Sequence, residues 1–186
     1  MSKANFSKTF TAAAEAVGAR VVAFDTVDPA LEFIAAHAAG TIFVPGFPSG
    51  ERMQLAGRLL GMGLDLAGSG RAAAEAAAAG VTGANFALAA TGTVVLESTA
   101  EAIRLATTLP ERHFILLDPA KIIADDFSAV PHLRELHRRQ PRNYLAYITG
   151  PSRTADIERV LTIGVHGPRE LHILLVPGLS SDCLEL

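Results

Sequence analysis

The sequence predicts an α/β fold with a mainly parallel sheet, helices on both faces and one β-hairpin. Short apolar runs of strand length alternate along the chain with segments of helical periodicity, and this alternation is typical of βαβ crossovers. The chain has 186 residues, of which 49% are hydrophobic and 19% are charged, so it has enough apolar material for a buried core. The hairpin, at residues 85–97, interrupts the alternation.

The first half of the chain predicts a strand, a helix and a second strand, followed by two more helices. The first helix begins at Asp28-Pro29, where an N-cap aspartate precedes a proline suited to the first turn, and it ends before Gly40. The last helix is an alanine-rich run closed by Gly80, which buries little area. The expected strands are residues 20–24 and 41–45, and the expected helices are residues 28–39, 51–60 and 71–79.

The second half continues the alternation after the hairpin. Apolar runs predict three more strands, which are separated by two amphipathic patterns. The expected strands are residues 113–117, 144–148 and 171–176, and the expected helices are residues 130–139 and 153–161.

The hairpin is predicted to turn at Ala90-Thr91-Gly92. A two-residue turn would force the β-branched Thr91 to positive φ, whereas a three-residue loop needs only Gly92 in the left-handed region. The three-residue loop places Asn85 opposite Glu97 and leaves small residues on one face, which suits the floor of a cleft. Its other face is expected to enter the core through Phe86, Leu88, Val94 and Leu96.

Glu97 is the leading candidate for a reactive or ligand-orienting carboxylate, because it lies at the open end of this hairpin. The alternative is that Glu97 only caps the end of a strand in solvent, as most strand-end glutamates do.

A second candidate site follows the strand at residues 144–148. The pattern there predicts a tight turn and a helix N-terminus, whose unpaired amides and positive dipole favour phosphate or carboxylate. Arg153 falls on the apolar side of the expected helix, where it meets either a bound anion or Asp156. Ligands of open α/β sheets sit beyond the carboxyl ends of the strands, where this turn is expected. The expected anion-binding residues are Gly150, Ser152, Arg153 and Thr154, and we expect them to form one cleft with Asn85 and Glu97.

Composition excludes several classes of function. The formal charge of −3 is too balanced for a broad nucleic-acid or anionic-membrane surface. The single cysteine, Cys183, excludes an intrachain disulfide, a Cys₄ zinc site and an iron–sulfur cluster held by this chain alone. The six histidines lack zinc-type spacing, so no metal site is expected. No apolar run approaches about 18 residues and no signal-type leader is visible, so we expect a cytoplasmic protein.

Four motifs in the same order resemble the LUD-domain family, in particular its LutC (YkgG) branch. The last of them brings His166 between two glycines, which let a loop approach a ligand closely. The motifs are Gly80-Val-Thr-Gly-Ala-Asn-Phe-Ala87, Ala90-Thr-Gly-Thr-Val-Val-Leu-Glu-Ser98, Ile148-Thr-Gly-Pro-Ser-Arg-Thr-Ala-Asp-Ile-Glu158 and Gly164-Val-His-Gly-Pro168.

The resemblance implies a NagB/RpiA/CoA transferase-like fold and one LUD-type domain over residues 1–186. Within that domain, residues 1–75 form an N-terminal βα part, 80–176 carry the motifs and 177–186 form a C-terminal tail. The chain departs from the family at Asn85, where an aspartate is common, and at Ala90, where a glutamate is common.

The resemblance also implies a role in L-lactate utilisation, in which LutC-like proteins act with iron–sulfur partner proteins to oxidise lactate to pyruvate. This chain would bind a small carboxylate or phosphorylated ligand and no cofactor of its own. Two alternatives stay open: a stand-alone enzyme of the CoA-transferase or sugar-phosphate-isomerase type that uses Glu97, and a non-catalytic interaction module. The expected ligand-binding residues are Thr82, Gly83, Asn85, Gly150, Ser152, Arg153, Thr154 and His166.

Overall fold

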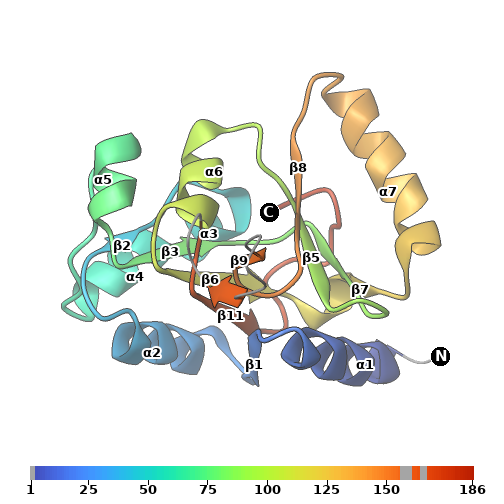
Figure 1. Cartoon of the computed structure of the whole chain (residues 1–186), viewed down its shortest axis with the longest axis horizontal. Coiled ribbons are helices and arrows are strands. Elements are labelled where there is room, and N and C mark those ends of the chain that lie inside the picture. The colour runs from blue at the N-terminus through green and yellow to red at the C-terminus, as the bar shows by residue number, and fades with distance from the viewer. Residues whose placement is uncertain (1–2, 156–160, 164–166) are drawn as a thin grey trace.

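Five parallel strands form the central sheet of the computed structural model, in the order β1-β11-β6-β3-β2 (Figure 1). The structure describes residues 3–155, 161–163 and 167–186. The mainly parallel α/β fold is therefore confirmed. The strands of this sheet are β1 (Arg20–Ala23), β2 (Ile42–Phe43), β3 (Ala79–Thr82), β6 (Arg112–Leu117) and β11 (Glu170–Leu175).

Helices cover both faces of the central sheet. The break between α3 and α4 falls at Gln54, which has a positive φ of 54°, so the one helix expected at residues 51–60 is two short ones. Gly80 belongs to β3 and does not end the alanine-rich helix, which stops at Ala76. The helices are α1 (Lys3–Ala16), α2 (Val27–His37), α3 (Pro48–Arg52), α4 (Leu55–Gly61), α5 (Arg71–Ala76), α6 (Glu101–Thr108), the 3₁₀ helix η1 (Pro119–Lys121) and α7 (Asp126–Arg139).

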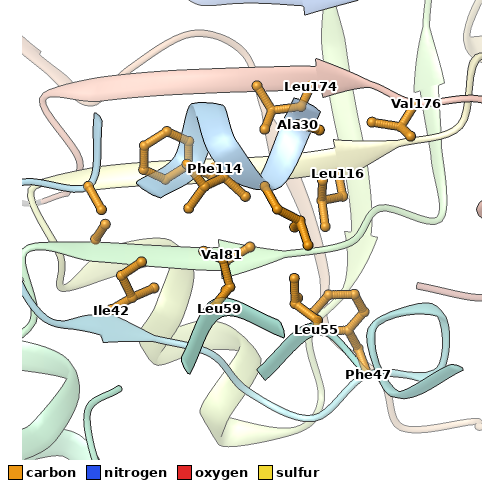
Figure 2. Close-up of a cluster of buried hydrophobic side chains, with 14 of the residues drawn as sticks. Ala30, Ile42, Phe47, Leu55, Leu59, Val81, Phe114, Leu116, Leu174 and Val176 are labelled. Carbon is orange, nitrogen blue, oxygen red and sulfur yellow. The ribbon is translucent and has the colours of Figure 1, made fainter. Parts of the chain in front are cut away.

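The largest core cluster lies between one face of the sheet and the helices α2 and α4 (Figure 2). Alternate residues of each strand point to this face, as the period of two requires. The strands contribute Val81, Phe114, Leu116 and Leu174, and α4 contributes Leu55 and Leu59, all of them buried.

The other face of the central sheet packs against α1 and a second, four-stranded sheet. Ile115 and Ile173 from the central sheet contact Phe10 and Ala14 of α1 and Val94 of the second sheet in one buried cluster. The order of the second sheet is β7-β4-β5-β8, and its far face packs on α7. Figure 1 shows this sheet and α7 together at one end of the molecule. Its strands are β4 (Phe86–Leu88), β5 (Thr93–Glu97), β7 (Ile122–Ile123) and β8 (Leu145–Ile148).

The hairpin forms where the sequence predicts it, but its register is shifted. Leu88 pairs with Thr93, so four residues connect the strands, and Gly92 has the expected positive φ of 67°. Phe86 therefore shares a face with Val95, and Ala87 shares the other with Val94. Both faces are buried, so the expected cleft floor of small residues is core, and the three-residue loop is wrong.

Two further expectations about the second half are wrong. The strand at residues 144–148 belongs to the second sheet and runs antiparallel to β5, not in the parallel sheet. Residues 153–161 do not begin as a helix, because β9 (Arg153–Ala155) pairs antiparallel with β10 (Leu161–Ile163). The apolar spacing that suggested a helix, at Ile157, Val160 and Leu161, lies largely outside the described residues.

Candidate functional site

The carboxyl ends of β2, β3, β6 and β11 meet at one edge of the central sheet, since these strands are parallel. We refer to this edge as the carboxyl edge. It is formed by the segments that follow each strand: residues 44–49, 83–85, 118–121 and 176–180. Open α/β sheets bind ligands at this edge. Functional residues are therefore expected in these segments.

Asn85 is fully buried at the carboxyl edge and connects β3 to the hairpin. Its amide N–H donates to the carbonyl oxygen of Val95 (3.0 Å), and its side-chain Oδ1 accepts from the amide N–H of Glu97 (2.6 Å). Among the described residues, its Nδ2 has no hydrogen-bond partner. A buried amide group without a partner costs free energy. Asn85 also lines a cavity of about 380 Å³, together with Glu97, Leu136, Arg139 and Leu186.

Glu97 lies at the end of β5, beside Asn85, as the hairpin predicted, although the two do not form a facing pair. Its side chain is partly buried, and Oε1 accepts from the amide N–H of Thr99 (2.8 Å). Glu97 therefore does two things in the structure: it lines the 380 Å³ cavity and it holds the turn after β5. The sequence analysis had left a role in a ligand site and a role at the end of the strand as alternatives.

Lys121 is the residue at this edge that sequence reasoning missed. Its side chain is only 2% exposed, and its Nζ donates to the carbonyl oxygens of Ala84 (3.0 Å) and Glu185 (2.5 Å). Burial lowers the pKa of Lys121, and the nearby carboxylates of Glu185, Asp118 and Asp182 oppose that shift. A signal was available, because Lys121 lies just beyond the apolar run at residues 113–117, at the end of a strand where ligands bind.

Asp118 shapes the loop that carries Lys121. Its Oδ1 accepts from the amide N–H of Ala120 (2.8 Å), and its Oδ2 accepts from the amide N–H of Ser180 (3.2 Å). The carboxylate thereby caps η1 and ties the loop to the C-terminal part of the chain. The hydrogen bonds of Asp118 thus fix the loop around Lys121, and Ala84 and Glu185 hold its Nζ.

Residues 179–186, which we call the C-terminal segment, lie over the carboxyl edge. The amide N–H of Ser49 donates to the carbonyl oxygen of Leu186 (3.1 Å). Arg52 donates to the carbonyl oxygen of Leu179 (3.2 Å) and pairs with the carboxylate of Glu185. Figure 1 places the C-terminal end in the middle of the molecule, and Leu186 is 9% exposed.

Gly83 allows this close packing. A Cβ atom at Gly83 would lie 2.7 Å from the carbonyl carbon of Leu186 and 3.1 Å from the ring of Phe47. A side chain at this position would therefore displace the C-terminal segment or the Phe47 ring.

The predicted turn at residues 149–152 lies at the opposite end of the second sheet from Glu97. The β5–β8 register pairs Val94 with Ile148 and Glu97 with Leu145, so these two pairs are about 10 Å apart at 3.3 Å per residue. Thr149 instead contacts Thr93 through their hydroxyl groups (2.8 Å). The two candidate sites therefore do not converge on one pocket.

The residues of that turn pack differently from the prediction. Gly150 and Ser152 line a separate cavity of about 210 Å³, and Gly150 lies against the carbonyl of Val17. Arg153 is exposed, and its guanidinium donates to the carbonyl oxygen of Val17 instead of pointing inward. Because β9 begins at Arg153, the described residues 149–155 form no helix N-terminus that could bind an anion.

Three further predicted site residues are Thr82, Thr154 and His166. Thr82 is buried, and its hydroxyl pairs with Nε2 of His113 (2.8 Å) below the sheet surface. Burial lowers the pKa of His113 to about 3, so this imidazole is neutral. The backbone of Thr154 pairs with Thr162 in the β9–β10 ribbon. His166 lies outside the described residues.

The structure describes no cluster of three or more histidine, cysteine, aspartate or glutamate side chains that could hold a metal ion. Over the same residues, no helix is both long and apolar enough to cross a membrane. The candidate site at the carboxyl edge is thus a small, partly covered cavity. Its polar lining suits a small polar ligand, and the polar side chains that line it are Asn85, Glu97, Arg139, Gln140, Asp182 and Glu185. The buried ammonium of Lys121 is not among the lining groups, but it donates to the carbonyl oxygen of Glu185, which is.

The structure thus defines the class of this protein: it is an α/β domain with a parallel central sheet and a cavity at the carboxyl edge of that sheet. The family model of the LUD domain matches residues 65–176, more than half of the chain, and the chain belongs to the LUD domain family. The expectation drawn from the four motifs is confirmed.

The comparisons with individual proteins agree with this family. The chain is 40% identical over 98 residues to an uncharacterised protein of Neisseria meningitidis serogroup B. That alignment covers 53% of this chain and 42% of the relative. It is 35% identical over 105 residues to lactate utilization protein C of Bacillus subtilis, covering 55% and 44% respectively. In these alignments the chain spans less than half the length of the relatives.

A solved structure shows the same fold over nearly the whole chain. The crystal structure of a DUF162 family protein from Deinococcus radiodurans matches with a TM-score of 0.70 and 23% identity, covering 95% of this chain and 99% of that one. At this identity the likeness establishes the architecture.

Proposed function

We propose that this chain is a LutC-like component of an L-lactate utilisation system and that it binds a small carboxylate, such as lactate or pyruvate, at the carboxyl edge. Membership in the LUD domain family and the relatives called lactate utilization protein C support the process. The binding site is proposed from the geometry of this chain alone.

The observation that carries the binding proposal is the buried ammonium of Lys121. A charged group that is 2% exposed costs several kcal/mol unless it is compensated. The described hydrogen bonds of the Lys121 Nζ go to two neutral peptide carbonyls, and the nearby carboxylates compensate only in part, because the pKa of Lys121 is still lowered by burial. A ligand carboxylate supplies a compensating negative charge. The Nδ2 of Asn85 is a further donor, and Asn85 lines the 380 Å³ cavity together with Glu185, whose carbonyl oxygen accepts from Lys121.

The proposed division of labour places the electron transfer on partner proteins. The sequence has one cysteine, whereas an iron–sulfur cluster commonly needs four cysteine ligands. Oxidation of lactate to pyruvate removes two electrons and two protons, which we assign to iron–sulfur partner proteins acting with this chain. In a reconstituted assay with an artificial acceptor, this chain alone should not turn over lactate, and addition of the partners should restore turnover.

Binding is tested by calorimetry with the purified chain, using L-lactate and pyruvate against their uncharged amides, lactamide and pyruvamide. We expect the acids to bind and the amides to bind at least tenfold more weakly, because the ammonium recognises charge. The variant Lys121→Met should lose binding of the acids, and Lys8→Met, at an exposed lysine, should not. Equal binding of acids and amides, or full binding by Lys121→Met, contradicts the proposal.

A second candidate function follows from the position of Glu97. Its carboxylate lines the same cavity as Asn85, which is the arrangement that a stand-alone transferase or isomerase would use for a nucleophile or general base. The test is Glu97→Gln, which keeps the acceptor for the amide N–H of Thr99. An activity of the chain alone that survives this change undiminished excludes the carboxylate from the chemistry.

A further inference from the structure

Two main-chain oxygens of the C-terminal segment accept hydrogen bonds from donors at the carboxyl edge. The Nζ of Lys121 donates to the carbonyl oxygen of Glu185 (2.5 Å), and the amide N–H of Ser49 donates to that of Leu186 (3.1 Å). Glu185 and Leu186 line the 380 Å³ cavity together with Asn85, whose Nδ2 has no partner among the described residues. A carboxylate presents two oxygen acceptors, so it can accept hydrogen bonds from more than one of these donors.

We propose that the C-terminal segment is an internal competitor for the carboxylate site. A small carboxylate binds to Lys121 and Ser49 in place of the main-chain oxygens of residues 185 and 186, with Asn85 as an additional donor, and the segment moves away as the carboxylate binds. This inference rests on the proposed function, because it concerns the same site, and it adds the donors and the means of regulation.

The exchange has a physical driving force. A hydrogen bond in which one group is ionised is about twice as strong as one between neutral groups, and a ligand carboxylate in contact with Lys121 makes the bond charged on both sides. The segment brings the carboxylates of Glu185 and Asp182 near Lys121, but the described hydrogen bond that it offers to the Nζ comes from a peptide carbonyl. The segment in turn is held by the buried side chain of Leu186 and by packing of Leu184 and Leu179 on neighbouring clusters. The measured affinity is then the intrinsic affinity multiplied by the fraction of molecules in which the segment is released.

Arg52 is the contact to change, because it holds the segment from outside the cavity. It bonds to Leu179 and Glu185 and does not line the cavity, and its side chain is 52% exposed. An exposed ion pair contributes about 0.2–1 kcal/mol, so Arg52→Ala should tighten pyruvate binding by roughly 1.5- to 5-fold. Deletion of residues 182–186 should tighten it further. The matched control is Arg58→Ala, which also removes an arginine ion pair, but one formed with Asp28 and not with the C-terminal segment.

The experiment measures pyruvate affinity by calorimetry for the full chain, for these three variants, and for Lys121→Met. It also measures hydrogen exchange of residues 179–186 in the full chain with and without saturating pyruvate. The inference expects tighter binding in Arg52→Ala and in the deletion, unchanged binding in Arg58→Ala, and faster exchange of the segment when pyruvate is bound.

Three results would overturn the inference, and they separate it from the proposed function. Pyruvate binding that is equally tight in the full chain, Arg52→Ala and the deletion refutes the competition but leaves the carboxylate site standing. Slower exchange of the segment with pyruvate bound means that the segment closes over the ligand, which also refutes competition. Absence of binding in every variant, the deletion included, refutes both.

Discussion

Individual side chains at the carboxyl edge are arranged at a cost to stability. Lys121 buries an ammonium group and Asn85 buries an amide Nδ2 without a described partner, and both costs fall within one small region. A core chosen for stability alone would use apolar side chains in these places. Because these costs are concentrated at the ends of parallel strands, they indicate a functional role for this edge of the sheet.

His113 gives a prediction about acid stability. Burial lowers its pKa from 6.5 to about 3, so the folded chain binds fewer protons than the unfolded chain between these two values. Stability must therefore fall as the pH decreases through this window. From pH 7 to pH 5 the contribution of His113 is on the order of 2 kcal/mol lost from the free energy of unfolding.

The measurement is urea unfolding at pH 7 and at pH 5. In His113→Gln the loss between these pH values should shrink by about that amount, whereas His137→Gln, at an exposed histidine, should keep it. The pKa of His172 is also lowered, chiefly by burial, and it contributes the same background to all three chains. An identical pH dependence in His113→Gln and the parent chain would show that His113 is not neutral in the fold.

At the scale of elements, the strands that carry strong apolar runs were predictable and the ribbon at residues 153–163 was not. Residues 113–117 and 171–176 are buried on both faces, so their composition alone marks them as central strands. Gly92 was correctly placed in the turn, because positive φ favours glycine. The register still slipped by one residue, since both faces of the hairpin are apolar and the hydrophobic pattern does not choose between them.

The candidate site was predictable only in part. Asn85 and Glu97 were found because they flank a recognisable hairpin, and that juxtaposition is local in sequence. Lys121 and the C-terminal segment were missed, because their contacts with Ala84 and Ser49 join parts of the chain far apart in sequence. Such long-range contacts leave no periodic signal.

The hairpin turn supports a prediction about how it packs on α1. A Cβ at Gly92 would lie 2.2 Å from the backbone nitrogen of Ala14, and Gly92 also has positive φ. Gly92→Ala should therefore cost both backbone strain and displacement of α1, roughly 2–4 kcal/mol of unfolding free energy.

The matched control is Gly178→Ala, at a positive φ of 82° with no atom within 4 Å of the added Cβ, which should cost only the strain, about 1 kcal/mol. Urea unfolding of the two variants separates the contributions. Equal losses would mean that α1 does not press on the turn.

The whole molecule has two ends with different roles in this account. The helices α2 and α4 pack on one face of the central sheet through a buried core, and the second sheet and α7 lie together at the other end of the molecule, where Leu136 and Arg139 of α7 line the carboxyl-edge cavity (Figure 1). The alignments cover less than half of relatives such as lactate utilization protein C of Bacillus subtilis. The assignment of lactate chemistry therefore depends on the site proposed in this chain and on its partners.

We propose that the carboxyl edge, and not the turn at residues 149–152, binds the carboxylate. Hydrogen exchange of the backbone amides with and without saturating L-lactate tests it directly, because it reports both places in one experiment. We predict changed exchange in residues 83–85, 118–121 and 179–186, with residues 149–152 and 167–168 unchanged. Changes confined to the turn around Ser152, or no change at either place, would contradict it.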